Sequence, residues 1–182
     1  DLIGMVQLAS GRILLPYARE TDGTLAILDS KIKRSDDRGA TWSDHSTVAV
    51  PGGYDTVFVY GTIRELTPGG TLYMPAYGFW TGAAVYSDAI LLQSTDGGVN
   101  WTLKGTIAAS NASRDFNEAD IVNTGGTNWL AIVRTEERAP GSGARVMKAT
   151  SSDDGATWGT PSTFDSAYSV SPCFYKIAND NI

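Results

Sequence analysis

Residues 151–158 read Ser-Ser-Asp-Asp-Gly-Ala-Thr-Trp, and two similar stretches stand at 35–42 (Ser-Asp-Asp-Arg-Gly-Ala-Thr-Trp) and 94–101 (Ser-Thr-Asp-Gly-Gly-Val-Asn-Trp). The common pattern is S-x-D-x-G-x-[TN]-W, and its tryptophans follow one another at intervals of 59 and 57 residues. Repetition at a nearly fixed period indicates a repeat architecture. The chain therefore contains three copies of one structural unit.

Each copy has the composition of a tight turn. Ser and Asp side chains hydrogen-bond to nearby backbone amides, and Gly adopts backbone conformations that a side chain would obstruct. The Trp is expected to start the returning strand and to bury its ring. Strand-like runs precede the copies at residues 32–34, 90–93 and 145–148. Each copy therefore predicts the turn of a β-hairpin.

A second hairpin pattern lies upstream of every copy. Its paired runs are 5–8 with 13–15, 62–66 with 72–74, and 119–122 with 129–133, and a fourth pattern begins at 173–177. Two hairpins, or four strands, for each repeat are typical of a propeller blade.

The repeated phrase resembles the Asp-box of the sialidase (neuraminidase) superfamily, also called the BNR repeat, and the resemblance covers nearly the whole chain. It implies an all-β, sialidase-type β-propeller in which three four-stranded blades, half of a six-bladed ring, are visible. Within the family the box is a structural turn remote from the active site. We expect one partial propeller domain, residues 1–182, with blades at 1–58, 59–116 and 117–171 and the start of a fourth at 172–182.

Composition narrows the class of protein. A net charge of −6 excludes the basic footprint of a nucleic-acid-binding protein. No apolar run is long enough to span a membrane. One His and one Cys leave no zinc constellation and no Ser-His-Asp triad, and the full ligand spacing of a calcium loop is absent. We therefore expect no metal and no cofactor, and the resemblance implies an extracellular or periplasmic location.

Three blades do not close a ring. Either the chain is a fragment of a longer protein or two copies complete one six-bladed ring, and the stop at 179–182, inside an expected hairpin turn, favours a fragment. Because open blade faces and unpaired strand edges favour association, we expect the chain to form a dimer.

The third repeat departs from the other two. Glu118 opens an expected inner strand and Arg134 closes its partner, whereas Gly4 or Gly61 stands at the position of Glu118 in the other repeats. The pair resembles the sialidase stretch in which a Glu activates a tyrosine nucleophile and an Arg holds the substrate carboxylate. Two interpretations remain, a catalytic Glu118 with a substrate-binding Arg134, or a structural salt bridge, because an Arg–carboxylate fork serves either purpose.

Other candidates lie on the face opposite the boxes, where longer loops are expected. Asp22 is a candidate acid/base, although Asp-Gly is also an ordinary turn, and Arg19 and Glu20 are candidate ligand contacts in the same loop. Arg145 stands where family members often have Arg. Glycan stacking or blade packing would account for the aromatic residues Tyr54, Tyr60, Tyr73, Tyr77, Phe79, Trp80 and Tyr86.

The remaining parts of a sialidase site are missing. The family's first arginine belongs to an Arg-Ile-Pro motif, and this chain has Leu2-Ile3-Gly4 there. The tyrosine nucleophile and third arginine belong to later blades. The resemblance thus implies a sialidase-like glycoside hydrolase, or a fragment of one, acting on sialic-acid-type glycans, and the chain alone lacks a full catalytic set. The alternatives are a non-catalytic glycan- or protein-binding propeller and a structural propeller.

Overall fold

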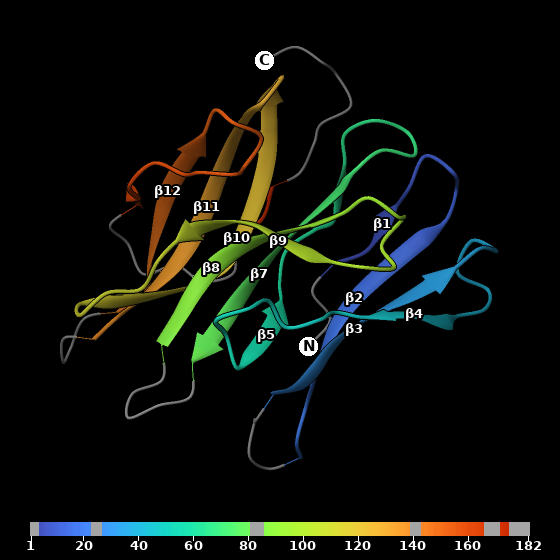
Figure 1. Cartoon of the computed structure of the whole chain (residues 1–182), viewed down its shortest axis with the longest axis horizontal. Helices are drawn as coiled ribbons and strands as arrows, with labels where there is room; N and C mark the ends of the chain where they lie inside the picture. Colours follow the sequence, from blue (N-terminus) through green and yellow to red (C-terminus); the bar gives the residue numbers. More distant parts are fainter. Residues whose placement is uncertain (1–3, 23–26, 81–85, 139–142, 166–171, 175–182) are drawn as a thin grey trace.

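Thirteen β-strands and no helix make up the described part of the chain, which in this computed structural model is residues 4–22, 27–80, 86–138, 143–165 and 172–174. The strands form three antiparallel sheets that follow one another in chain order (Figure 1). The first sheet has the order β1-β2-β3-β4. Its strands are β1 (Val6–Gln7), β2 (Ile13–Glu20), β3 (Ile27–Ser35) and β4 (Ser43–Thr47).

The second sheet has the order β5-β7-β8-β9, and β6 also pairs with β7. Its first position is therefore filled by two short strands. The strands are β5 (Thr56–Val59), β6 (Arg64–Glu65), β7 (Leu72–Trp80), β8 (Tyr86–Ser94) and β9 (Thr102–Ala108). The third sheet has the order β10-β11-β12-β13, with β10 (Arg114–Gly125), β11 (Asn128–Glu137), β12 (Arg145–Ser151) and β13 (Ser162–Asp165).

This architecture confirms the predicted all-β propeller fold with four-stranded blades. The fourth hairpin expected from Cys173 lies largely outside the described residues, and no strand is assigned at 172–174.

The three Asp-boxes lie at the turns between the third and fourth strands of their sheets, as predicted, and share one hydrogen-bond pattern. In the third box the backbone N–H of Gly155 donates to Ser151 Oγ at 3.0 Å. Both the backbone N–H and the hydroxyl of Thr157 donate to the Asp153 carboxylate, at 2.9 and 2.6 Å. The Trp158 indole N–H donates to the Gly155 carbonyl. The boxes therefore act as structural turns.

The second and third boxes also pack against the preceding sheet. Trp101 belongs to the hydrophobic core between the first two sheets, and Trp158 packs against the core between the second and third. Trp42 is exposed, which contradicts the expectation that every box tryptophan buries its ring. The reason is that no described sheet precedes the first one.

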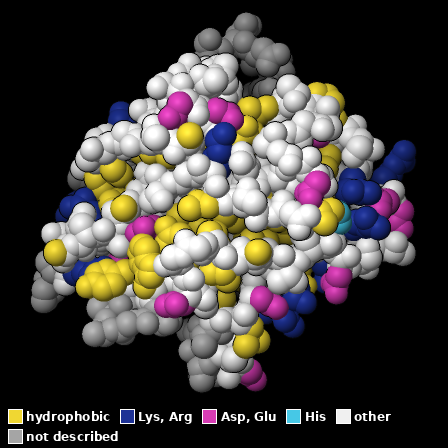
Figure 2. Space-filling view, viewed as in Figure 1, with side chains coloured by type: hydrophobic (Ala, Val, Ile, Leu, Met, Phe, Trp, Pro, Cys, Tyr) yellow, Lys and Arg dark blue, Asp and Glu magenta, His cyan; other side chains and the backbone are white. Residues whose placement is uncertain are grey.

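The third strand of each sheet has side chains at equivalent positions relative to its Asp-box. These side chains are aliphatic where another sheet packs on them, and they are lysines on the outer faces of the first and third sheets. Ile32 and Leu91 pack toward the next sheet in the two cores, whereas Lys148, at the same position of the third sheet, is exposed. On the face of the second sheet that packs against the first, Ile90 and Leu92 are buried. The equivalent face of the first sheet, which no described sheet covers, has Lys31 and Lys33 at these positions. In the space-filling view of Figure 2, hydrophobic side chains gather over the middle of one face of the molecule.

A buried ion pair joins the second and third sheets near their first strands. Arg64 Nη2 lies 2.8 Å from Asp120 Oδ2, and the Asp120 side chain is 1% exposed. Asp120 Oδ2 also accepts the backbone N–H of Phe174, and Arg64 donates to the Phe174 carbonyl. One carboxylate thus links three separate segments of the chain.

Candidate functional site

A β-bulge positions the two charged residues singled out in the third repeat. Phe116 pairs with Thr135 and Ala119 pairs with Val133, so Asn117 and Glu118 together oppose the single residue Arg134. A bulge bends its strand and redirects a side chain, and bulges are frequent beside active sites.

Arg134 lies among three acceptor side chains. Its Nη1 is 3.9 Å from Glu118 Oε1 and donates to Asn117 Oδ1 at 3.3 Å, and its Nη2 donates to Glu136 Oε1 at 2.9 Å. The side chains of Arg134 and Glu118 are 17% and 20% exposed. The Arg134 Nε is buried and has no hydrogen-bond partner in the described part of the chain. The guanidinium therefore keeps one buried donor unsatisfied in addition to the two nitrogens that contact these acceptors.

The structural counterpart of this pair in the second sheet is aromatic. Tyr77 stands 57 residues before Arg134, and its register partner is Phe58, whose ring stacks on Tyr77 at 5.0 Å between centroids. The expectation that Gly61 corresponds to Glu118 is wrong, because Gly61 lies beyond β5. The pair still breaks the repeat, since charges replace two stacked rings.

Gly61 has a different role. Its φ is +88°, and a Cβ built on it would lie 2.5 Å from the carbonyl oxygen of Ala119. It therefore permits the close approach of the two inner strands. Gly4, also named as a counterpart of Glu118, has Thr62 as its nearest neighbour.

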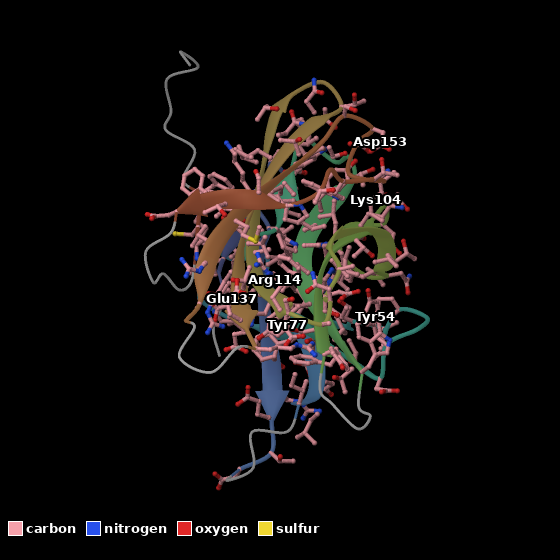
Figure 3. The ribbon with its side chains drawn as sticks, turned by 90° about the vertical axis from the view of Figure 1, so that its left-hand side faces the viewer. Tyr54, Tyr77, Lys104, Arg114, Glu137 and Asp153 are labelled. Atoms are coloured by element: carbon pink, nitrogen blue, oxygen red, sulfur yellow. The ribbon has the colours of Figure 1, made fainter. Side chains whose placement is uncertain are left out.

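Tyr77 belongs to the same region as Glu118 and Arg134. Burial raises its pKa above the ordinary value, the negative charge of Glu118 raises it further, and Arg134 acts in the opposite direction. The pKa of Tyr77 also responds to Tyr60 and Glu20. The phenol therefore stays protonated at neutral pH and can donate a hydrogen bond. Figure 3 shows Tyr77 far from Asp153, which places this region at the end of the sheets opposite the third box.

The first-sheet candidates lie at the end of β2 rather than in a loop. Arg19 pairs with Asp29 across the hairpin through two hydrogen bonds, which lowers the pKa of the Asp29 carboxyl. That guanidinium is thus already occupied. Glu20 is the last residue of β2 and influences Tyr77, and Asp22 lies exposed in the turn that follows.

Arg145 begins β12, and its backbone is bonded to the Thr135 hydroxyl. Arg134 pairs with Val146, so strand alternation directs Arg145 to the other face of the sheet. The structure therefore brings Glu118, Arg134, Tyr77 and Glu20 into one region and separates Arg145 from it.

Sequence reasoning gave no individual role to Asn117 or Tyr77. The repeat interval could have identified Tyr77, because Tyr77 stands 57 residues before Arg134. Asn117 became visible only when the bulge placed it opposite Arg134. Within the described ranges, no group of three His, Cys, Asp or Glu side chains is arranged to hold a metal ion, and no helix is long and apolar enough to cross a membrane.

Three antiparallel blades with one structural turn each, and a charged pair at the opposite end, define a β-propeller of the sialidase type. The family model of the BNR repeat-like domain matches residues 4–172, and the chain belongs to this family. No curated protein matches the chain.

Several solved structures share the fold. A Dyadobacter fermentans protein of unknown function is 20% identical with a TM-score of 0.74, and the match covers 90% of this chain and 50% of that protein. A Penicillium chrysogenum α-L-arabinanase complexed with arabinobiose is 19% identical with a TM-score of 0.64, covering 87% and 47%. The Hadza microbial sialidase Hz136 is 17% identical with a TM-score of 0.57, covering 87% and 32%. The chain thus spans half or less of the length of these proteins.

Proposed function

We propose that this protein belongs to a sialidase-like glycoside hydrolase acting on sialic-acid-type glycans, and that Glu118 and Arg134 lie in its glycan site. Residues 1–182 would form one partial propeller domain within it. The observation that supports this proposal is the Glu118–Arg134 pair at a β-bulge, on the end of the sheets opposite the Asp-boxes.

The chemistry of the pair fits two roles in such a site. The planar guanidinium of Arg134 suits a carboxylate, which it binds through two parallel hydrogen bonds. Its Nη atoms contact Asn117, Glu118 and Glu136, so an incoming sugar acid would compete with these neighbours. Glu118 is then the carboxylate that accepts a proton.

Tyr77 is better suited to binding than to nucleophilic attack. Retaining sialidases depart from the usual carboxylate pair by using a Tyr nucleophile. Burial and the negative charge of Glu118 raise the pKa of Tyr77, so its hydroxyl is a hydrogen-bond donor and not a phenolate at neutral pH. We therefore assign Tyr77 a hydrogen-bonding and ring-packing role, and the nucleophile of the proposed hydrolase remains to be supplied by residues outside this set.

A non-catalytic glycan-binding propeller is the second candidate. Two observations favour it. Arg134 already donates to Glu136, and Arg19 is paired with Asp29, so neither guanidinium is without an acidic partner. Among the similar solved structures, the arabinanase is complexed with arabinobiose, which is a neutral disaccharide. Arabinobiose is therefore a suitable comparison ligand.

Calorimetric titration of this chain with sialyllactose and arabinobiose, combined with an assay for released sialic acid on the whole hydrolase to which we propose it belongs, tests the proposal. We expect sialyllactose to bind more tightly, and Glu118→Gln to abolish release without abolishing binding. Asp36→Asn, at the box end of the first sheet, is the matched control and should change neither. Binding without release in the unmodified protein would support the second candidate, and the absence of binding to either glycan would contradict both.

A further inference from the structure

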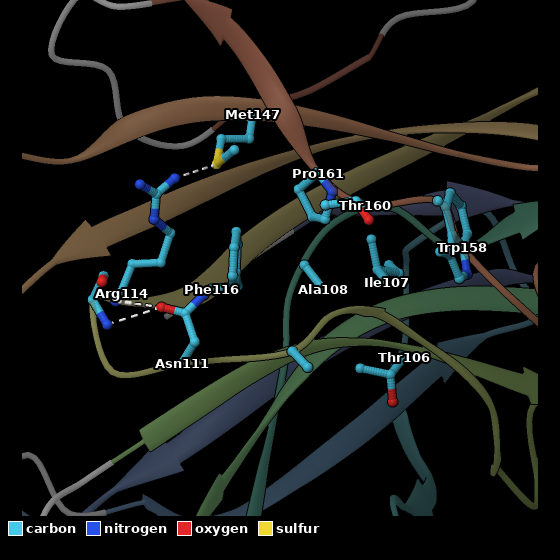
Figure 4. A pocket seen from close by; sticks show the side chains of 13 residues that line it. Thr106, Ile107, Ala108, Asn111, Arg114, Phe116, Met147, Trp158, Thr160 and Pro161 are labelled. Carbon is cyan, nitrogen blue, oxygen red and sulfur yellow. Dashed lines mark hydrogen bonds between the residues drawn. The ribbon is translucent and has the colours of Figure 1, made fainter.

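A cleft opens between the second and third sheets, beside β9 and the start of β10. It has a volume of about 470 Å³ and is lined by β9, the loop that follows it, the start of β10 and the segment after Trp158 (Figure 4). Small-molecule sites typically have volumes of about 300–1,000 Å³. The cleft is therefore large enough for a ligand of one or two sugar rings.

An arginine with weak partners lies at one end of this cleft. The Arg114 guanidinium donates to the thioether of Met147 at 3.0 Å, and its Nη2 lies 3.4 Å from Glu137 Oε2. A thioether is a weak acceptor, and 3.4 Å is long for a charge-assisted hydrogen bond. Because Arg carries five N–H donors, these two contacts leave most of its capacity for a planar anion unused.

The floor and the rim of the cleft differ in polarity. Phe116, Ile107 and Ala108 supply an apolar floor, and all three are buried. Figure 4 shows Arg114 and Trp158 on opposite sides of this floor, with Thr160 on the side of Trp158. A ligand that matches this pattern has one carboxylate, one apolar face and several hydroxyls.

We propose that this cleft is a second binding site, and that it takes a sugar acid whose carboxylate pairs with Arg114 while its ring lies over Phe116. A pyranose ring has an apolar C–H face for the floor and hydroxyls for the exposed Thr160. A neutral sugar lacks the group that Arg114 recognises, and an acidic peptide lacks the flat hydroxylated ring.

The site is separable from the one proposed above. Arg114 contacts Met147 and Glu137, whereas Arg134 contacts Asn117, Glu118 and Glu136, so the two arginines share no partner in the described structure. The chain has a net charge of −6, which disfavours long-range attraction of an anion. Binding should therefore depend on the local fork geometry of Arg114.

Saturation-transfer NMR and calorimetry with D-glucuronate, D-glucose and an acidic pentapeptide test this proposal on the intact chain. We expect D-glucuronate to bind at least about tenfold more tightly than the other two probes. Arg114→Gln should weaken D-glucuronate binding by at least about tenfold, and Arg114→Lys should weaken it although the charge is kept. Arg12→Gln, at the exposed Arg12–Asp36 pair, is the matched control and should leave this affinity unchanged.

A second variant keeps the test independent of the folding of Arg114→Gln. Thr160→Trp adds bulk at the exposed rim without touching the guanidinium, and we expect it to abolish D-glucuronate binding while the amide spectrum of the rest of the chain is preserved. Equal binding of D-glucose, equal binding of the pentapeptide, or unchanged affinity in both Arg114→Gln and Thr160→Trp would overturn the proposal. If D-glucuronate binding is lost only in Arg134→Lys, the sugar acid occupies the other site and the proposal is likewise overturned.

Discussion

Arg134 lies directly across β10–β11 from the two-residue bulge that contains Glu118, with Nη1 of the arginine 3.9 Å from Oε1 of the glutamate. The corresponding place in the second sheet holds the stacked rings of Phe58 and Tyr77. One blade therefore presents charge at a position where its neighbour presents aromatic surface. The pKa of Tyr77 responds to both charges.

Gly61→Ala should destabilise the protein more than Gly11→Ala. Both glycines have similar positive φ angles, +88° and +87°, so each alanine costs about 1–2 kcal/mol in backbone strain. Only at Gly61 would the new Cβ meet a backbone atom, the Ala119 carbonyl oxygen at 2.5 Å, whereas nothing lies within 4 Å at Gly11. Urea denaturation should give a clearly larger loss for Gly61→Ala, and equal losses would show that the two inner strands are not held this closely.

Asp120→Asn should lower the free energy of unfolding by about 3 kcal/mol, because it leaves the Arg64 charge largely buried without its partner. Asp36→Asn removes a partner of Arg12 at an exposed pair and should have almost no effect. Both variants are compared by urea denaturation at neutral pH. If they are equally mild, the Arg64–Asp120 pair does not hold the sheets together.

The Asp-boxes predict a loss of stability in acid. Hydrogen bonds from Thr41 and Thr157 lower the pKa of Asp37 and Asp153 to about 2, and bonds from Asn100 lower that of Asp96 to about 2. Since the folded-state pKa lies below the ordinary value of 3.8, the stabilisation is fully present above about pH 4 and is lost as the pH falls toward 2. Urea midpoints across this range should fall, and Asp153→Asn should make that fall shallower. A midpoint that is flat between about pH 4 and pH 2 would exclude this contribution.

We propose that the chain forms a dimer, and the outer faces predict how it responds to salt. If the third sheet of one copy packs on the first sheet of another, Lys148 meets the positions of Lys31 and Lys33, by analogy with the two internal cores. Like charges oppose this contact, and 1 M salt shortens the screening length to about 3 Å. Light scattering should therefore show stronger association at high salt. A monomer at high protein concentration in both conditions would exclude the dimer.

The periodic phrase was sufficient to predict the fold because each box contains its own hydrogen-bond partners. Ser151, Asp153 and Thr157 interact within seven residues of sequence, so a local pattern reports a local structure. Burial of Trp42 was not predictable in this way, since it depends on whether another sheet packs on the first. The box itself positions the tryptophan ring through the indole hydrogen bond, whereas the burial of that ring depends on tertiary packing.

The candidate site was predictable only in part for the same reason. Glu118 and Arg134 stood out because they break the repeat, and the structure places them together. Phe58, three residues before Gly61, stands opposite Tyr77, so Gly61 is not the counterpart of Glu118, and Asn117 was overlooked because the bulge adds a second residue opposite Arg134. Arg19 looked available in the sequence because its partner Asp29 lies across a hairpin whose register a sequence does not specify.

Arg134→Lys offers the most direct test of a glycan site at the bulge, through calorimetric titration with a sialic acid analogue and thermal melts with and without it. The account predicts that the Kd rises at least about tenfold, because lysine keeps the charge but loses the planar fork. It also predicts that the Tm without ligand changes by less than about 3 °C, since lysine keeps the positive charge beside Glu118 and Glu136. An unchanged Kd together with a Tm lowered by more than about 5 °C would contradict the account and make the pair a structural salt bridge.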